Sequence, residues 1–346
     1  MNFRKISINL TLLCIGCFIS LVIIESFVRF FISEPIQPRF VIDSGFGVRE
    51  NQPNVKYKHY YPDEYAIVIN TNNDGLRGKK EYSLIPDEKS YRIAIVGDSH
   101  VFGYGCNDDE VISFVLEKEL NHSSRKYEVL NFAVSGFGQA EAFVTYAEKI
   151  KNYNPDLVIV SYFNNDVGND AVSNLFAFEG DSLIRTNNSY LPGVKAREKM
   201  YANLILRLLF EHSQTWNLIR NRLSGIIHSR LLSNKGLSGF DGSNNDQSKK
   251  LNKGIIQKFV DTIIGDGISV GVFIIPRRSL KSNFPFKISE LQDDVLFIID
   301  GRKIFQSSDY YLTEGHLNPS GHNKAAIAIK NIIIDSKVFK EQQTSF

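Results

Sequence analysis

The sequence predicts an α/β fold with a central parallel sheet, and three observations support this. Short apolar runs recur at 92–96, 127–132 and 157–163, the pattern of strands that are buried on both faces of a sheet. Segments with helical spacing of apolar residues lie between these runs. A polar or glycine-bearing turn follows each run. Alternating strands and helices form a parallel sheet through right-handed crossovers, and ligands bind beyond its carboxyl edge.

The composition is that of a globular chain, and it argues against nucleic-acid binding and against a cysteine-based site. With 346 residues, 43% of them hydrophobic, the chain is long enough to bury a sizeable core. The 40 Lys and Arg residues nearly balance the 38 Asp and Glu residues, so the net charge of +2 gives no electrostatic case for nucleic acid binding. The three cysteines, Cys14, Cys17 and Cys106, provide neither a disulfide framework nor a cysteine-rich metal site.

The N-terminal segment predicts a membrane anchor. The stretch Ile6–Ile24 contains no charged residue and is long enough to span a bilayer. We expect it to remain uncleaved, because no Ala-x-Ala pattern lies near Ser33 and the surroundings of Cys17 fit a lipoprotein processing site poorly. Arg4 and Lys5 precede the span, so the positive-inside rule places the N-terminus in the cytoplasm and the rest of the chain outside it.

Three regions follow from this pattern. Residues 1–33 form a cytoplasmic tip and a transmembrane anchor, 34–89 form a stalk and a small β-rich lead-in, and 90–340 form the domain that carries the chemistry. Within the lead-in, Asn72–Gly75 is a strong turn signal, and Leu76–Gly78 is expected to cross the surface of the main domain. The lead-in is interpreted as structural.

The main domain is expected to alternate strands and helices, apart from one insertion. After the first strand, we expect a helix over 111–120, a strand at 127–132, a glycine-bearing turn at 133–138, a helix at 139–153 and a strand at 157–163. The pattern resumes with a helix at 251–264, strands at 270–275 and 297–300, and a C-terminal helix through 325–333. Between them, 168–254 is the insertion. Residues 200–227 are expected to form helices across the top of the sheet or a cap, and 235–250 an exposed or disordered loop.

Four residues at strand or loop ends predict nucleophilic catalysis. Ser99 follows the first strand within Gly97-Asp98-Ser99, a sequence that is also typical of a simple turn and helix N-cap. Gly136 and Asn165 follow the next two strands, and His316 precedes the last helix. A serine hydroxyl needs a base such as an imidazole, and a tetrahedral intermediate needs hydrogen-bond donors. The Ser99 and Gly136 backbone N–H groups and the Asn165 amide are candidate donors.

These residues resemble the four blocks of the SGNH hydrolase superfamily, also called GDSL esterases. Gly97–Ser99 resembles the first block, 131–138 the second, 164–166 the third, and His316 within 315–319 the last. The resemblance covers roughly 91–166 and 313–330. It implies a flavodoxin-like three-layer α/β/α sandwich and Ser-His catalysis on esters, with Ser99 as nucleophile and with Gly136 and Asn165 completing an oxyanion hole. It implies nothing about the insertion.

The acid of the expected triad departs from the family pattern. Family members usually carry Asp two or three residues before the histidine, whereas this chain has Thr313 and Glu314 there. Glutamate can orient an imidazolium, so we expect Glu314 to act as the acid, with Asp309 as the alternative. His100, which replaces the leucine of the family name, occupies a variable position.

Other polar residues near these blocks are interpreted as structural. Asp98 is expected to fix the turn behind the nucleophile, His322 to lie in the first turn of the last helix, and Asp166 and Asp170 to support the loop of Asn165. None of them shows metal-ligand spacing, and Gly103 and Gly105 lack a dinucleotide fingerprint. We therefore expect no cofactor and no metal.

The leading hypothesis is a membrane-anchored, extracytoplasmic serine esterase that removes acyl groups, acetyl being the expected one, from a carbohydrate. The lead-in and the single anchor also resemble SGNH proteins associated with bacterial exopolysaccharide and cell-envelope glycans, which implies glycan-biosynthesis proteins as partners. Two alternatives remain open. One is an O-acyltransferase that passes the acyl group to a sugar hydroxyl and needs a separate membrane partner to supply it. The other is a non-catalytic glycan-binding or assembly protein on the same fold.

Overall fold

A five-stranded parallel sheet forms the centre of the protein in the computed structural model, which describes residues 3–122, 125–234, 246–291 and 295–335. The strands are β5 (Ser90–Val96), β6 (Lys126–Asn131), β7 (Leu157–Phe163), β10 (Ser269–Ile275) and β11 (Phe297–Asp300). Their order in the sheet is β6-β5-β7-β10-β11, and every neighbouring pair is parallel. In chain order this is 2-1-3-4-5, the flavodoxin-like arrangement, whose switch point lies between the first and third strands.

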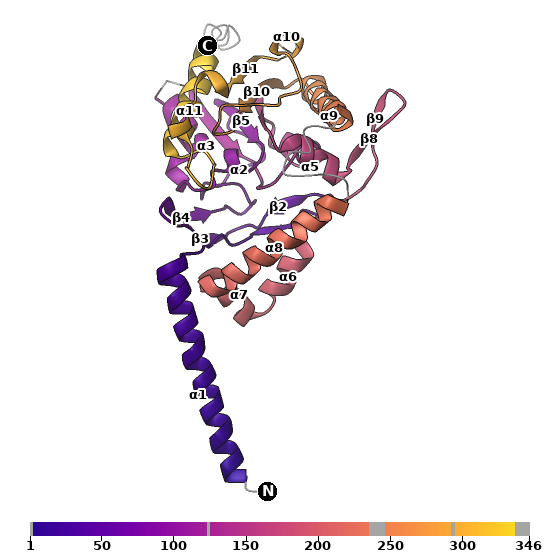
Figure 1. Ribbon diagram of the computed structural model, residues 1–346. Helices are drawn as coiled ribbons and strands as arrows, with labels where there is room; N and C mark the ends of the chain where they lie inside the picture. The colour runs from indigo at the N-terminus through magenta and orange to yellow at the C-terminus, as the bar shows by residue number, and fades with distance from the viewer. Residues whose placement is uncertain (1–2, 123–124, 235–245, 292–294, 336–346) are drawn as a thin grey trace.

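Helices cover both faces of this sheet and complete a three-layer α/β/α sandwich (Figure 1). One hydrophobic cluster joins the sheet to α4 (Gln139–Glu148) and α9 (Asp246–Gly265), beside α5 (Asp166–Ser173). The other joins it to α3 (Ile112–Leu120) and α11 (Pro319–Asp335). The described part of the domain also contains the short helices α2 (Ser99–Phe102) and α10 (Ile288–Leu291) and the turns η2 (Asp108–Glu110), η3 (Ile150–Tyr153), η5 (Gly301–Lys303) and η6 (Ser307–Asp309). The predicted fold class is therefore confirmed.

The lead-in consists of two antiparallel hairpins packed on the main domain. Its strands are β1 (Val41–Asp43) with β2 (Arg49–Asn51), and β3 (Lys56–Tyr61) with β4 (Tyr65–Asn70). The expected turn lies at Asn72–Gly75, where the Gly75 N–H donates to the Asn72 carbonyl. Leu76 and Arg77 are buried rather than on the surface of the domain, and the buried Arg77 guanidinium forms an ion pair with Asp108 and donates to the Cys106 carbonyl.

Between α5 and residue 234, the described part of the insertion forms a β-hairpin and three helices. The hairpin pairs β8 (Phe176–Glu179) with β9 (Ser182–Arg185). The helices are α6 (Val194–Tyr201), α7 (Leu204–His212) and α8 (Gln214–Asn234), and Figure 1 shows them beneath β2, with α7 close to the N-terminal helix. Of the loop expected at 235–250, residues 235–245 lie outside the described residues, and 246–250 begin α9.

The N-terminal helix projects away from the rest of the molecule. It comprises α1 (Phe3–Phe27) and its continuation η1 (Val28–Ile32). The stretch Lys5–Ile32 is long and apolar enough to cross a membrane, and none of its most hydrophobic window is buried within the protein. This composition fits a membrane anchor and also an N-terminal signal sequence.

Candidate active site

Ser99 lies at the carboxyl end of β5 because three adjacent residues force an abrupt turn there. The strand is buried along its whole length, and at Gly97 a Cβ atom would lie 1.7 Å from the Ser161 hydroxyl, so only glycine fits. The Asp98 carboxylate then accepts the His100 N–H at 2.9 Å and caps α2. The cap and the nucleophile position are therefore not alternatives, since Asp98 provides the cap and Ser99 is the first residue of the helix.

The imidazole of His316 contacts Ser99 from a loop just before α11. His316 Nε2 lies 2.7 Å from Ser99 Oγ. Gly315 adopts a positive φ of 84°, which glycine tolerates and which lets the chain turn tightly here. The His316 carbonyl accepts the Tyr311 N–H at 2.9 Å, which ties the loop at His316 back to residue 311.

Glu314 contacts the other nitrogen of the same imidazole. His316 Nδ1 is hydrogen-bonded to Glu314 Oε1, and the His316 backbone N–H donates to Glu314 Oε2 at 3.1 Å. The structure thus brings together the three residues that were expected to form a triad, Ser99, His316 and Glu314.

The alternative acid, Asp309, lies in a different network. Its carboxylate forms an ion pair with Lys324 at 2.8 Å and accepts the Ser320 hydroxyl at 2.8 Å. These contacts tie the turn η6 to α11. Asp309 makes no contact with the imidazole in the described part of the chain, so its geometry fits a structural role.

The charge of Glu314 controls the protonation of His316. Burial disfavours the imidazolium, but the negative charge and hydrogen bond of Glu314 outweigh burial, with a further contribution from Asp98, and raise the His316 pKa above 6.5. His100 behaves in the opposite way. Its ring is buried 4.6 Å from the His316 ring, and burial, followed by the charge of His316, lowers its pKa well below 6.5. Burial therefore disfavours the charged form of His100 next to Ser99 and His316.

The candidate oxyanion donors lie on three neighbouring strand ends. Ser99 and Asn165 follow β5 and β7, on the two sides of the switch point, and Gly136 follows β6. The Val134 N–H donates to the Gly97 carbonyl at 3.0 Å, which joins the turn after β6 to the nucleophile turn. The Asn165 amide lies 3.4 Å from the Asp98 carboxylate, so its second N–H is available for another acceptor. Within the described residues, the Ser99 and Gly136 N–H groups donate to no protein acceptor.

The structural interpretation of the other polar residues fits the geometry. His322 lies in the first turn of α11, where its Nδ1 accepts the Ile112 N–H at 3.1 Å. Asp166 accepts the Phe163 N–H at 3.0 Å, and Asp170 accepts the Ala140 N–H at 2.8 Å. These bonds fix the loop on both sides of Asn165.

Two lead-in residues support the site, and nothing in the sequence pattern identified them. The Arg49 guanidinium donates to the Gly136 carbonyl at 2.9 Å and forms a buried ion pair with Glu141 at 2.8 Å. The Glu64 carboxylate accepts the backbone N–H groups of Thr313 and Glu314, at 2.6 and 3.0 Å. Because Arg49 is 87 residues from Gly136 and Glu64 is 250 residues from Glu314, local periodicity contains no signal for either contact.

Comparison with known proteins gives structural neighbours but no sequence relative. No family model and no curated protein matches the chain. Among solved structures, one described as TesA covers 70% of this chain and 97% of its own, at 11% identity and a TM-score of 0.42. Esterase EstA from Pseudoalteromonas sp. covers 73% and 99%, at 14% identity and a TM-score of 0.38. A family 3 carbohydrate esterase from Clostridium thermocellum covers 73% and 99%, at 15% identity and a TM-score of 0.34. With TM-scores below 0.5, these likenesses establish neither a family nor an activity for this chain.

Proposed function

We propose that the protein is a serine ester hydrolase of the SGNH type, with Ser99 as nucleophile, His316 as general base and Glu314 as the orienting acid. The observation that carries the proposal is the continuous hydrogen-bonded chain from Ser99 Oγ through both nitrogens of His316 to Glu314. A non-catalytic binding protein has no need for this arrangement beside unpaired backbone donors. The departure from aspartate to Glu314 therefore does not favour the binding alternative.

The geometry supports a two-step acyl-enzyme mechanism. Ser99 Oγ attacks the ester carbonyl while His316 Nε2 takes its proton, and the Ser99 N–H, the Gly136 N–H and the Asn165 amide donate to the oxyanion. The intermediate then expels the alcohol, which receives the proton from His316, and leaves an acyl group on Ser99. Water, activated by the same imidazole, releases the acid. Each oxyanion donor typically contributes about 100- to 1,000-fold in rate.

We further propose that the substrate is an acylated, most simply acetylated, carbohydrate outside the cytoplasm. The charge-free span after Arg4 and Lys5 supports an anchored chain with its main domain on the outer side. Envelope-glycan biosynthesis proteins are then its expected partners. The same acyl-enzyme intermediate would transfer its acyl group to a sugar hydroxyl if a sugar replaced water.

Ester hydrolysis by the detergent-solubilised full chain tests this proposal. The wild type should hydrolyse a small activated acetyl ester, and Ser99→Ala and His316→Ala should each lose about 10³-fold or more of that rate. Equal inactivity of the wild type and Ser99→Ala across short-chain esters would exclude hydrolysis. Donor-dependent gain of acetyl on a glycan, with little hydrolysis of the donor alone, would assign the protein to acyl transfer.

A further inference from the structure

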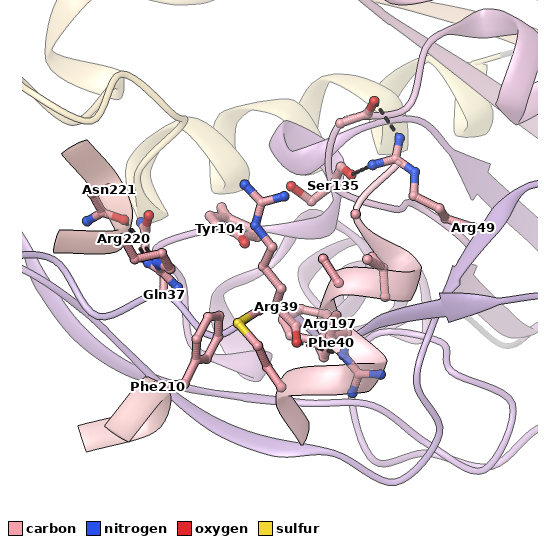
Figure 2. A pocket seen from close by; sticks show the side chains of 15 residues that line it. Gln37, Arg39, Phe40, Arg49, Tyr104, Ser135, Arg197, Phe210, Arg220 and Asn221 are labelled. Atoms are coloured by element: carbon pink, nitrogen blue, oxygen red, sulfur yellow. Dashed lines mark hydrogen bonds between the residues drawn. The ribbon is translucent and has the colours of Figure 1, made fainter. Parts of the chain in front are cut away.

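A cavity of about 650 Å³ adjoins the turn that carries the proposed oxyanion donor. Ser135 and Gly136 form part of its wall, and so does Tyr104, whose ring centroid lies 5.5 Å from that of His316. The other walls come from the lead-in before and within β2 and from helices α6, α7 and α8 (Figure 2). The insertion and the lead-in thus enclose a space directly beside the reacting groups.

The lining of this cavity is strongly cationic. Its 15 residues include four arginines and no aspartate or glutamate. Glu141 neutralises Arg49. Across the described residues, however, Arg39, Arg197 and Arg220 form no ion pair with a carboxylate. Arg197 instead donates to the Arg39 carbonyl and to the side chain of Gln52, which are both uncharged. Three guanidinium groups therefore line one small space, and the carboxylate next to the lining, Glu34, accepts a hydrogen bond from Asn221 at 2.8 Å rather than from an arginine.

The guanidinium of Arg220 is held in the wall of the cavity and is partly shielded from solvent. Its guanidinium lies 4.5 Å from the centre of the Phe210 ring and donates to the Asn221 side chain at 2.8 Å, while one of its nitrogens is buried without a hydrogen-bond partner. Burial, followed by the positive charge of Arg39, lowers the Arg220 pKa to about 10, against smaller opposing effects of Tyr104, Tyr201 and Glu34. The guanidinium groups of Arg39 and Arg220 line the same cavity and repel each other, so an anion bound between them would stabilise both.

We propose that this cavity binds an anionic group of the acyl-bearing substrate, a carboxylate or a phosphate, with Arg39 and Arg220 as its principal ligands. That the anion belongs to the substrate rests on the proposed function, in which the ester is held at Ser99 next to this cavity. Guanidinium groups bind both anions through paired hydrogen bonds. Phe40 and Met200 supply apolar wall for the uncharged part of the same substrate.

Binding to the full-length Ser99→Ala chain in detergent tests this without requiring catalysis. The probes are three acetylated oligosaccharides that bear a carboxylate, a phosphate or no charge, and calorimetry gives each dissociation constant. At least one charged probe should bind about tenfold or more tightly than the neutral one, and the better of the two identifies the anion. Raising the ionic strength should reduce the difference in affinity between the charged and the neutral probes, because salt screens the arginines.

Variants locate the preference in this cavity. Arg39→Gln and Arg220→Gln should each reduce the ratio of charged to neutral affinity by about fivefold or more, whereas Lys199→Gln, an exposed lysine on α6 and outside the lining, should leave it unchanged. Equal affinity for all three probes, or a preference that survives both cavity variants, would overturn the inference. Failure of ester hydrolysis by the wild type would overturn the proposed function and leave this binding result intact.

A second, independent observation concerns the outer surface of the insertion. Large apolar side chains are exposed on α7 and α8, and none of them packs on the core. They include Leu204 (68% exposed), Ile205 (69%), Leu208 (48%), Ile219 (50%) and Leu223 (54%). Exposed apolar clusters of this kind mark an interaction surface. Arg222 on α8 is exposed too and adds positive charge to this surface, whereas Arg207 on α7 is ion-paired with Glu211 at 3.0 Å.

These helices are fixed to the end of the anchor. The Glu25 carboxylate accepts the Ser213 hydroxyl at 2.8 Å and the Gln214 and Thr215 N–H groups at 2.9 and 3.1 Å, and Arg29 donates to the His212 carbonyl at 2.8 Å. Figure 1 shows α7 and α8 beside the end of α1 that joins the lead-in. We infer that this apolar, basic face of α7 and α8 (204–223) lies on the surface of an anionic lipid bilayer, next to the point where α1 leaves it.

Trp216, the one tryptophan of the chain, reports on this contact. The full chain is reconstituted in phosphatidylcholine vesicles with and without phosphatidylglycerol, and its fluorescence is quenched by lipids that carry a nitroxide at a shallow position. We expect strong quenching that increases with the anionic lipid and falls at least twofold in Leu204→Gln/Ile205→Gln/Leu208→Gln. Ile85→Gln, at an exposed apolar residue outside these helices, is the matched control. Quenching that is equal in the triple variant and the control would exclude bilayer contact.

Discussion

The imidazole of His316 lies between a hydroxyl that must lose a proton and a carboxylate that favours the protonated ring. A general base acts only when it is neutral, and the His316 pKa is raised above 6.5 mainly because Glu314 offsets the effect of burial. The rate of hydrolysis should therefore fall as the pH drops through a pKa that is higher than that of an ordinary histidine.

Glu314→Gln tests this relation. The change removes the negative charge, so the acid limb of the pH–rate profile should move to lower pH, and the maximal rate should fall by between about 10²- and 10⁴-fold, because the ring loses its preferred tautomer and its charge partner. The measurement is kcat/KM for a small ester from pH 5 to 9. Asp309→Asn, whose side chain bonds Lys324 and Ser320, is the matched control. An unshifted limb in Glu314→Gln would remove Glu314 from the triad.

The positions of the candidate residues were predictable where a strand end determined them, and unpredictable where a distant segment did. Ser99, Gly136 and Asn165 each follow a buried strand, so sheet topology alone places them at one edge. Arg49 and Glu64 act through hydrogen bonds to backbone atoms on segments far away in the sequence. No local pattern encodes such contacts, because their partners are carbonyl and N–H groups that every residue has.

At the scale of elements, the strands were predicted best, because each of them is a short, nearly unbroken run of apolar residues. The predicted ranges 157–163 and 297–300 coincide with β7 and β11. The helix expected over 139–153 ends earlier, since α4 stops at Glu148 and the turn η3 completes the segment. Asn154, in the left-handed conformation, then ends η3. The insertion escaped detailed prediction because its helices pack on the lead-in and the anchor rather than on the sheet.

The turn between β5 and α2 depends on the absence of a side chain at residue 97. A Cβ atom on Gly97 would lie 1.7 Å from the Ser161 hydroxyl and 3.1 Å from its Cβ. Gly97→Ala should therefore displace Ser99, reduce ester hydrolysis by about 10²-fold or more and lower the stability by about 1–3 kcal/mol. Adding Ser161→Ala removes the closest atom and should recover part of both losses, as measured by hydrolysis rate and thermal unfolding. No recovery in the double variant would mean that this contact does not limit the turn.

The lead-in hairpin of β1 and β2 contributes a buried ion pair to the main domain. Glu141 is fully buried, and Arg49 is its charged partner. Removing one partner of such a pair leaves a buried charge, so Arg49→Met should lower the free energy of unfolding by about 3–5 kcal/mol. Arg49→Met/Glu141→Leu should regain most of this stability, which denaturation of the detergent-solubilised chain measures.

The same pair of variants separates stability from catalysis. Arg49 also binds the Gly136 carbonyl, so the stable double variant should still hydrolyse esters more slowly than the wild type. Full activity in the double variant would show that Arg49 contributes to folding but not to the position of the oxyanion donor.

At the scale of the whole molecule, the proposed topology depends on one apolar helix, α1, which would place the site outside the cytoplasm. Arg4 and Lys5 precede the span, and everything from the lead-in onward is attached to its other end. The length and composition of this helix could be predicted from sequence. Its relation to the insertion could not, since the contacts of Glu25 with 213–215 join segments that are almost two hundred residues apart.

Cysteine labelling in bacterial spheroplasts tests this topology, because the native cysteines provide a low background. Cys106 is buried, and Cys14 and Cys17 lie in α1, within the lipid if the helix spans the membrane. Ile85→Cys places a thiol at a position that is 77% exposed on the lead-in side, and Phe3→Cys places one at a position that is 79% exposed on the other side of the span. A membrane-impermeant maleimide should label Ile85→Cys in intact spheroplasts and Phe3→Cys only after lysis. The reverse pattern would place the main domain in the cytoplasm, and labelling of Ile85→Cys in the soluble fraction would show that α1 is a cleaved signal sequence. The reverse pattern would overturn the extracytoplasmic glycan substrate, whereas a cleaved signal sequence would overturn only the membrane anchor; the chemistry at Ser99 is tested separately by hydrolysis.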